Sequence, residues 1–112
     1  MVGMAGTAFK ITPEGILMSF TFLGSDGFDP NAGLALDTQG NLFGTTFSGG
    51  ASNDGVAFEI TAEGDETVLH SFAGSDGATP YSGLIVDQQD VLYGTTGFRG
   101  TSNQGTVFEL VQ

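Results

Sequence analysis

The sequence contains no cysteine, so neither a disulfide framework nor a thiolate metal site stabilises its fold. Basic residues are almost absent as well. Lys10 and Arg99 face 13 acidic residues, which gives a formal net charge of -11. Nucleic acids and anionic membranes are bound through basic surfaces, so this charge argues against both as partners. It permits cation binding and favours solubility.

Long apolar segments are also missing. No apolar run approaches the ~20 residues of a membrane-spanning helix. Residues 1–6 lack a basic stretch followed by a hydrophobic core, so we expect no signal peptide in this chain. No stretch shows a helical apolar period over a useful length, and the expected secondary structure is therefore β-strand.

One sequence pattern occurs twice in the chain. The Gly-Ser-Asp-Gly segment at 24–27 returns at 74–77, and the Gly-Thr-Thr segment at 44–46 returns at 94–96, each 50 residues later. A period of this length is typical of repeat architectures whose units cannot bury their faces alone. We treat residues 1–112 as a single repeat unit, with a first repeat at 6–54, a second at 55–104 and an extra strand at 105–112.

Short runs rich in Phe, Val, Ile, Leu and Thr, bounded by Gly, Pro, Asp or Asn, predict four strands in each repeat. They are expected at 7–12, 17–22, 33–37, 41–46, 56–61, 67–72, 83–87, 91–96 and 106–111. Tight turns alternate with longer loops. If successive strands are antiparallel, the long loops share one face, and ligand-binding residues tend to lie on such loops. These loops are 23–32, 47–55, 73–82 and 97–105.

Four antiparallel strands in each 40–50 residues are typical of a β-propeller blade, so we predict an all-β fold built of such blades. The alternative is a two-sheet β-sandwich. We favour the propeller because the strands at 33–37 and 83–87 are apolar at every central position, as expected of a strand buried on both faces.

The segment from Pro30 to Thr46, with its Gly-Leu-Ala-Leu-Asp and Asn-Leu-Phe-Gly-Thr-Thr motifs, resembles the GloVer tandem repeat of bacterial secreted and surface-anchored proteins. The segment from Pro80 to Leu110 matches as well, and a weaker similarity extends to NHL-type and lactonase-like propellers. The resemblance implies propeller architecture, an extracellular or cell-surface location, and no catalytic motif. It also implies that strand 33–37 is innermost and strand 67–72 outermost in a blade.

That order divides the chain into sheets at 7–22, 33–72 and 83–111. The last sheet lacks an outer strand, and the strand at 17–22 is spare. We expect the spare strand to complete a sheet of a neighbouring copy, so that about three or four chains close a ring. The alternative is that the chain is a fragment of a longer propeller.

The candidate ligand-binding residues are those on the long-loop face that differ between the repeats. Aromatic rings beside amides and one arginine suit a polysaccharide or protein ligand, and the alternative is that the rings cap the sheets. The set comprises Phe28, Asp29, Asn31, Phe47, Tyr81, Phe98 and Arg99.

The candidate metal ligands are Asp26, Asp29 and Asp76, whose oxygens suit calcium. Turn stabilisation is the favoured interpretation of these aspartates. Asp37 and Asp87 recur where tight turns begin and are interpreted as turn caps.

We therefore expect a non-catalytic repeat module for binding or scaffolding, with calcium as the only cofactor considered. One alternative is a calcium-dependent enzyme of the lactonase or hydrolase kind. The other is a structural protein that forms fibres through exposed sheet edges.

Overall fold

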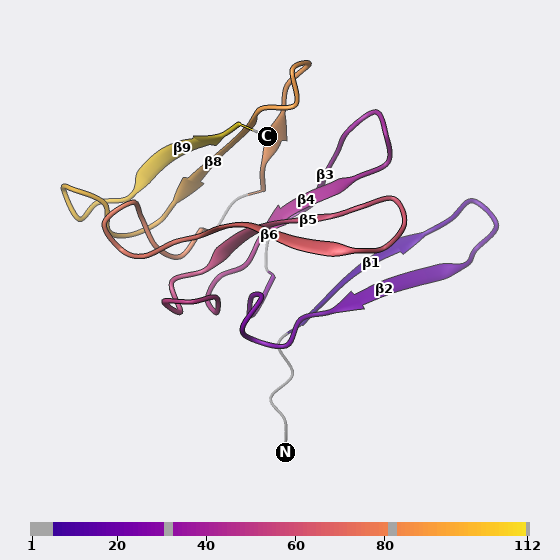
Figure 1. Cartoon of the computed structure of the whole chain (residues 1–112), viewed down its shortest axis with the longest axis horizontal. Helices are drawn as coiled ribbons and strands as arrows, with labels where there is room; N and C mark the ends of the chain where they lie inside the picture. Colours follow the sequence, from indigo (N-terminus) through magenta and orange to yellow (C-terminus); the bar gives the residue numbers. More distant parts are fainter. Residues whose placement is uncertain (1–5, 31–32, 81–82, 112) are drawn as a thin grey trace.

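The computed structural model describes residues 6–30, 33–80 and 83–111. Over these residues the fold is all-β, with nine strands in three antiparallel sheets that follow one another along the chain (Figure 1). In this part of the chain there are three small sheets rather than the two that a sandwich requires. Within the same ranges, no helix is long and apolar enough to cross a membrane.

In each sheet the order of the strands is their order in the sequence. The first sheet has β1 (Thr7–Ile11) and β2 (Leu17–Thr21). The second has β3 (Ala35–Leu36), β4 (Leu42–Thr45), β5 (Val56–Ile60) and β6 (Glu66–Ser71). The third has β7 (Ile85–Val86), β8 (Leu92–Thr96) and β9 (Thr106–Leu110). The second sheet thus takes two strands from each repeat, and β3 and β7 are shorter than predicted.

The hydrophobic core lies between neighbouring sheets. One cluster joins the first two sheets through Ala8 and Phe22 on one side and Phe58 and Ile60 on the other. The Phe22 and Phe58 rings meet edge to face with centroids 4.9 Å apart. The same contact recurs between the second and third sheets, where Phe72 meets Phe108 at 5.0 Å. Each sheet is therefore stabilised mainly by the next one.

The recurring Gly-Thr-Thr motif serves this packing. A Cβ atom at Gly44 would lie 2.8 Å from the Phe58 ring, and one at Gly94 would lie 2.6 Å from the Phe108 ring. The last threonine of the motif closes the strand end: Thr46 Oγ1 accepts the Val56 N–H at 3.1 Å and donates to the Ser48 carbonyl at 2.9 Å. Both features explain why the motif recurs, and neither requires a ligand.

Two central side chains of β3 and β7 contradict the expectation that these strands are buried on both faces. Leu36 is 64% exposed and Ile85 is 68% exposed. Leu36 pairs with Leu42, which packs toward the first sheet, and the two strands that the described residues form in that sheet do not cover Leu36. Ile85 pairs with Tyr93 on the face of β7 and β8 that points away from the second sheet. Leu36 is thus exposed beside the short first sheet, and Ile85 is exposed on the outward face of the third sheet.

Candidate functional site

The long loops lie side by side, as the alternation of tight and long connections predicts. In the first repeat, Phe28 and Ser48 exchange two backbone hydrogen bonds of 2.8 and 3.0 Å. Their counterparts Ala78 and Phe98 do the same at 2.9 and 3.2 Å. The Thr79 N–H donates to the Asp54 carbonyl at 2.8 Å, which joins the loops of the two repeats. The face is therefore continuous across the second and third sheets.

Five of the predicted ligand-binding residues can be placed on this face. Phe28, Asp29 and Phe47 come together in the first repeat, where the Phe47 N–H donates to the Asp29 carbonyl at 2.9 Å. Phe98 and Arg99 adjoin the corresponding bridge of the second repeat. Asn31 and Tyr81 lie outside the described residues.

Each bridge presents one phenylalanine. In the first repeat it is Phe28, opposite Ser48, and in the second it is Phe98, opposite Ala78. The rings are 39% and 52% exposed, respectively. One accessible aromatic ring per repeat at the same bridge is a suitable surface for stacking on a flat, extended ligand.

Two of the three aspartates proposed as calcium ligands, Asp26 and Asp76, act as turn residues. Asp26 Oδ1 accepts the Leu23 N–H at 2.9 Å, and Asp76 Oδ1 accepts the Ala73 N–H at 3.0 Å. Each closes the turn of its own Gly-Ser-Asp-Gly segment. Over residues 6–30, 33–80 and 83–111, no group of three His, Asp or Glu side chains is placed to hold a metal ion. Calcium binding through Asp26, Asp29 and Asp76 stays a prediction.

His70 breaks the symmetry of the two repeats because its counterpart is Phe20. Its ring keeps the aromatic role, since it meets Phe72 edge to face at 4.8 Å as Phe20 meets Phe22 at 5.2 Å. The His70 ring also makes a polar contact that Phe20 cannot make, because its Nε2 atom lies 2.6 Å from Asp76 Oδ2. Burial acts to raise the pKa of Asp76, but the Ala73 N–H and His70 outweigh it, so this pKa is lowered.

Glu66, at the start of β6, is not among the candidate residues expected from the sequence. Its Oε2 atom is buried and has no hydrogen-bond partner among the described residues. Desolvation, helped by repulsion from Asp26, raises the pKa of Glu66 from 4.5 to about 7. Glu66 pairs with Ile60 as Leu17 pairs with Ile11, so a carboxylate occupies a position that is apolar in the first repeat.

The tight turns on the opposite face are closed by aspartates in both repeats. Asp37 Oδ1 accepts the N–H groups of Gln39 and Asn41, each at 2.9 Å. Asp87 Oδ1 likewise accepts those of Gln89 and Val91, at 2.8 and 2.9 Å. The prediction that these two aspartates are turn caps is therefore confirmed.

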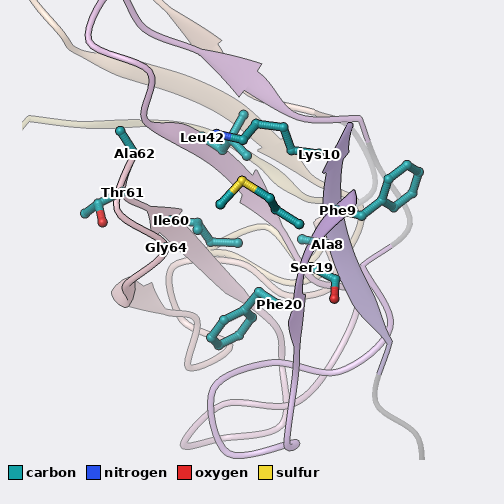
Figure 2. A pocket seen from close by; sticks show the side chains of 11 residues that line it. Ala8, Phe9, Lys10, Ser19, Phe20, Leu42, Ile60, Thr61, Ala62 and Gly64 are labelled. Carbon is teal, nitrogen blue, oxygen red and sulfur yellow. The ribbon is translucent and has the colours of Figure 1, made fainter. Parts of the chain in front are cut away.

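Two hollows flank β1. The first lies between β1–β2 and the second sheet and has a volume of ≈ 70 Å³. Figure 2 shows Ala8, Phe20 and Ile60 around it, with the Lys10 side chain extending toward Leu42. The second is larger, ≈ 270 Å³, and is bounded by one edge of β1 and by the segment that leads into β3. Its lining comprises Thr7, Ala8, Phe9, Pro30, Gly33 and Leu34.

Comparison with protein families gives a match to the Gloeobacter/Verrucomicrobia repeat over residues 2–112. The chain belongs to this repeat family. The GloVer resemblance seen in the motifs is thereby confirmed over nearly the whole sequence. Comparison with curated proteins and with solved structures finds no match. Membership in the Gloeobacter/Verrucomicrobia repeat family establishes a repeat module, and the use of that module has to be argued from its surfaces.

Proposed function

We propose that this Gloeobacter/Verrucomicrobia repeat is a non-catalytic β-propeller module that packs its end sheets against those of other copies and closes into a ring. The ring serves as a scaffold or binding platform. An extracellular or cell-surface location, which the family resemblance implied, belongs to the same proposal.

The supporting observation is the burial of equivalent residues. Phe58 and Ile60 of β5 are 0% and 6% exposed because the first sheet covers them. Their counterparts on β1, Phe9 and Ile11, are 60% and 62% exposed. At the other end of the chain, Val107 is 82% exposed, whereas its counterpart Ala57 is fully buried.

The exposed faces of the first and third sheets therefore correspond to the two surfaces that are buried against each other at both sheet–sheet contacts within the chain. Covering a large apolar side chain gains about 1.5–3 kcal/mol, and contiguous exposed apolar patches mark interaction surfaces. The two end faces differ from each other, so copies join head to tail, and such contacts close into rings when the rotation allows.

The non-catalytic part of the proposal is supported by the hydrogen bonds of the candidate polar residues. Asp26, Asp76, Asp37 and Asp87 close turns, and Thr46 closes a strand end. These side chains are used by the fold in both repeats. Calcium-dependent thermal stabilisation together with lactone or ester turnover would instead favour the enzyme alternative.

The test is the absolute mass of the native particle by size-exclusion chromatography with light scattering. We expect a discrete species of about three or four chains, each of 11.5 kDa. A monodisperse species with the mass of one chain contradicts the ring. Electron microscopy separates rings from the filaments that the fibre alternative requires.

A polysaccharide is the second candidate for what the module binds, because each repeat presents one exposed ring, Phe28 or Phe98, at the same bridge. Stacking on a sugar ring needs only an accessible aromatic face of this kind. The double variant F28A/F98A should lose retention on insoluble cellulose, chitin or starch that the wild type shows. The matched control, I16A, alters an exposed apolar residue at the tight turn before β2, away from the loop face, and should keep that retention.

A further inference from the structure

Among the described residues, the first sheet has no counterpart of the two inner strands of the second sheet. In the second sheet, β5 pairs with β4 on one edge and with β6 on the other. In the first sheet, β1 pairs with β2, and no strand in the described ranges pairs with its other edge. The larger hollow, ≈ 270 Å³, lies beside Thr7, Ala8 and Phe9 of β1.

The interior of the chain shows what fills this hollow when inner strands are present. Its lining residue Leu34 is 38% exposed, whereas the counterpart Leu84 is 7% exposed and packs against Phe43 of β4. Its lining residue Pro30 is half-buried, whereas the counterpart Pro80 is fully buried. A strand carrying an aromatic residue at the position of Phe43 completes the site.

Strand β8 carries an aromatic residue at this position. Tyr93 of β8 is the counterpart of Phe43, and it is half-buried on the outward end face of the third sheet. Its hydroxyl donates to Asp87 Oδ2 at 3.0 Å, so the polar end of the side chain is already satisfied. Tyrosine suits a position where the ring becomes buried and the hydroxyl keeps a partner.

We propose that copies of this chain join by strand exchange: the β1–β2 hairpin of one copy takes the place of β9 on the edge of β8 in the next copy. This inference rests on the proposed ring, but in place of face-to-face packing it joins the first and third sheets into one composite sheet, from which β9 is displaced. The composite sheet then has the order β7, β8, β1, β2, which matches β3, β4, β5, β6 of the complete sheet.

The register follows from the pairing of β8 with β9, in which Tyr93 faces Glu109 and Gly94 faces Phe108. Replacing each β9 residue by its β1 counterpart sets Tyr93 opposite Lys10 and Gly94 opposite Phe9. The Phe9 ring thus gains the glycine over which its counterparts Phe58 and Phe108 lie. The exchange also replaces an acidic side chain with one of the two basic ones in a chain of net charge -11.

The structure favours β1 over β9 in the composite sheet. The position that faces the following sheet is alanine in both interfaces within the chain, Ala8 and Ala57, and both are buried. In β9 this position is Val107, whose extra methyl groups overpack a site built for alanine. Keeping β1 also preserves its pairing with β2 over five residue pairs.

The first experiment locks β9 in place. The sequence has no native cysteine, so the pair T95C/V107C, which face each other and leave Tyr93 in place, forms one disulfide between β8 and β9. We expect oxidation to convert the oligomer to single chains and reduction to restore it. If the oxidised variant keeps the wild-type oligomeric mass, strand exchange is wrong while the ring stands. If the wild type itself has the mass of one chain, the ring is wrong, and the two failures are distinguishable.

The second experiment captures the exchanged pair. K10C chains are mixed with tagged Y93C chains, and we expect a disulfide-linked heterodimer. The matched control mixes M18C with Y93C, because Met18 lies one strand farther away, opposite Lys10 on β2. An absent cross-link, or an equal one with M18C, overturns the proposal.

Discussion

Phe9 and Phe58 occupy the same position in successive copies of the repeat, yet the first side chain is 60% exposed and the second is fully buried. Phe58 lies over Gly44 and against Phe22 of the first sheet. No described sheet precedes β1, so Phe9 has neither contact. The difference arises from position in the row of sheets and not from residue type.

Truncating these two residues should therefore have different effects. We expect F58A to lower the free energy of unfolding by about 3–5 kcal/mol, because it removes a fully buried ring. We expect F9A to leave the unfolding of dilute single chains within about 0.5 kcal/mol of the wild type and to reduce the mass of the assembly. Thermal unfolding and light scattering measure the two effects. Equal destabilisation by both variants contradicts the assignment of Phe9 to an end face.

The glycine of the Gly-Thr-Thr motif should not tolerate a methyl group. In G44A the new Cβ meets Leu34 at 2.7 Å and the Phe58 ring at 2.8 Å, so we expect a loss of about 1–3 kcal/mol from overpacking. Gly33 is the matched control, because a Cβ atom there meets no atom within 4 Å. Urea unfolding measures the difference in unfolding free energy between G44A and G33A, provided that the two variants show the same dependence of this free energy on urea concentration. If G44A is as stable as G33A, the close packing of Phe58 on this glycine is not limiting.

Glu66 should make stability depend on pH. Its pKa is raised from 4.5 to about 7, so the folded state holds the proton more tightly than the unfolded state. The free energy of unfolding should therefore fall as the pH rises through this window. Because Glu66 as a whole is only half-buried, solvent screens the effect, and we expect a contribution of about 1 kcal/mol.

The variant E66Q should be more stable than the wild type above pH ~7 and equal to it near pH ~4. The matched control is E63Q, at the exposed turn before β6. It should follow the wild-type profile of melting temperature against pH. A wild-type profile that E66Q leaves unchanged would mean that the carboxyl is not desolvated.

The two repeats offer a direct measurement of the His70–Asp76 contact. D76N weakens the turn bond to Ala73 and loses the contact to His70, whereas D26N weakens only the equivalent turn bond. Because both partners are partly exposed, we expect D76N to cost about 0.2–1 kcal/mol more than D26N at pH ~7. Both variants should be compared in an E66Q background, which removes the repulsion between Asp26 and Glu66.

The lowered pKa of Asp76 fixes the direction of the pH effect. A depressed carboxyl pKa contributes stability above its unfolded value of 3.8, and this contribution is lost as the pH falls through the folded value. The deficit of D76N should therefore shrink in acid. A deficit that is constant down to pH ~2 would contradict the lowered pKa of Asp76.

The sequence by itself determined the strands, their order and the turns. Short apolar runs between Gly, Pro, Asp and Asn specify local backbone geometry, so the nine strands lie within a residue or two of their expected ranges. The aspartates of the tight turns were predictable because an Asx turn needs only residues a few positions apart. The repeat family was recognisable from the motifs alone.

Only the tertiary structure decided which side chains are covered. Burial depends on the neighbouring sheet, so Leu34 and Leu84, or Phe9 and Phe58, are indistinguishable in the sequence and different in the fold. The raised pKa of Glu66 has the same origin, since desolvation comes from packing. A repeated sequence repeats its local conformations, whereas long-range contacts depend on where each copy stands in the row.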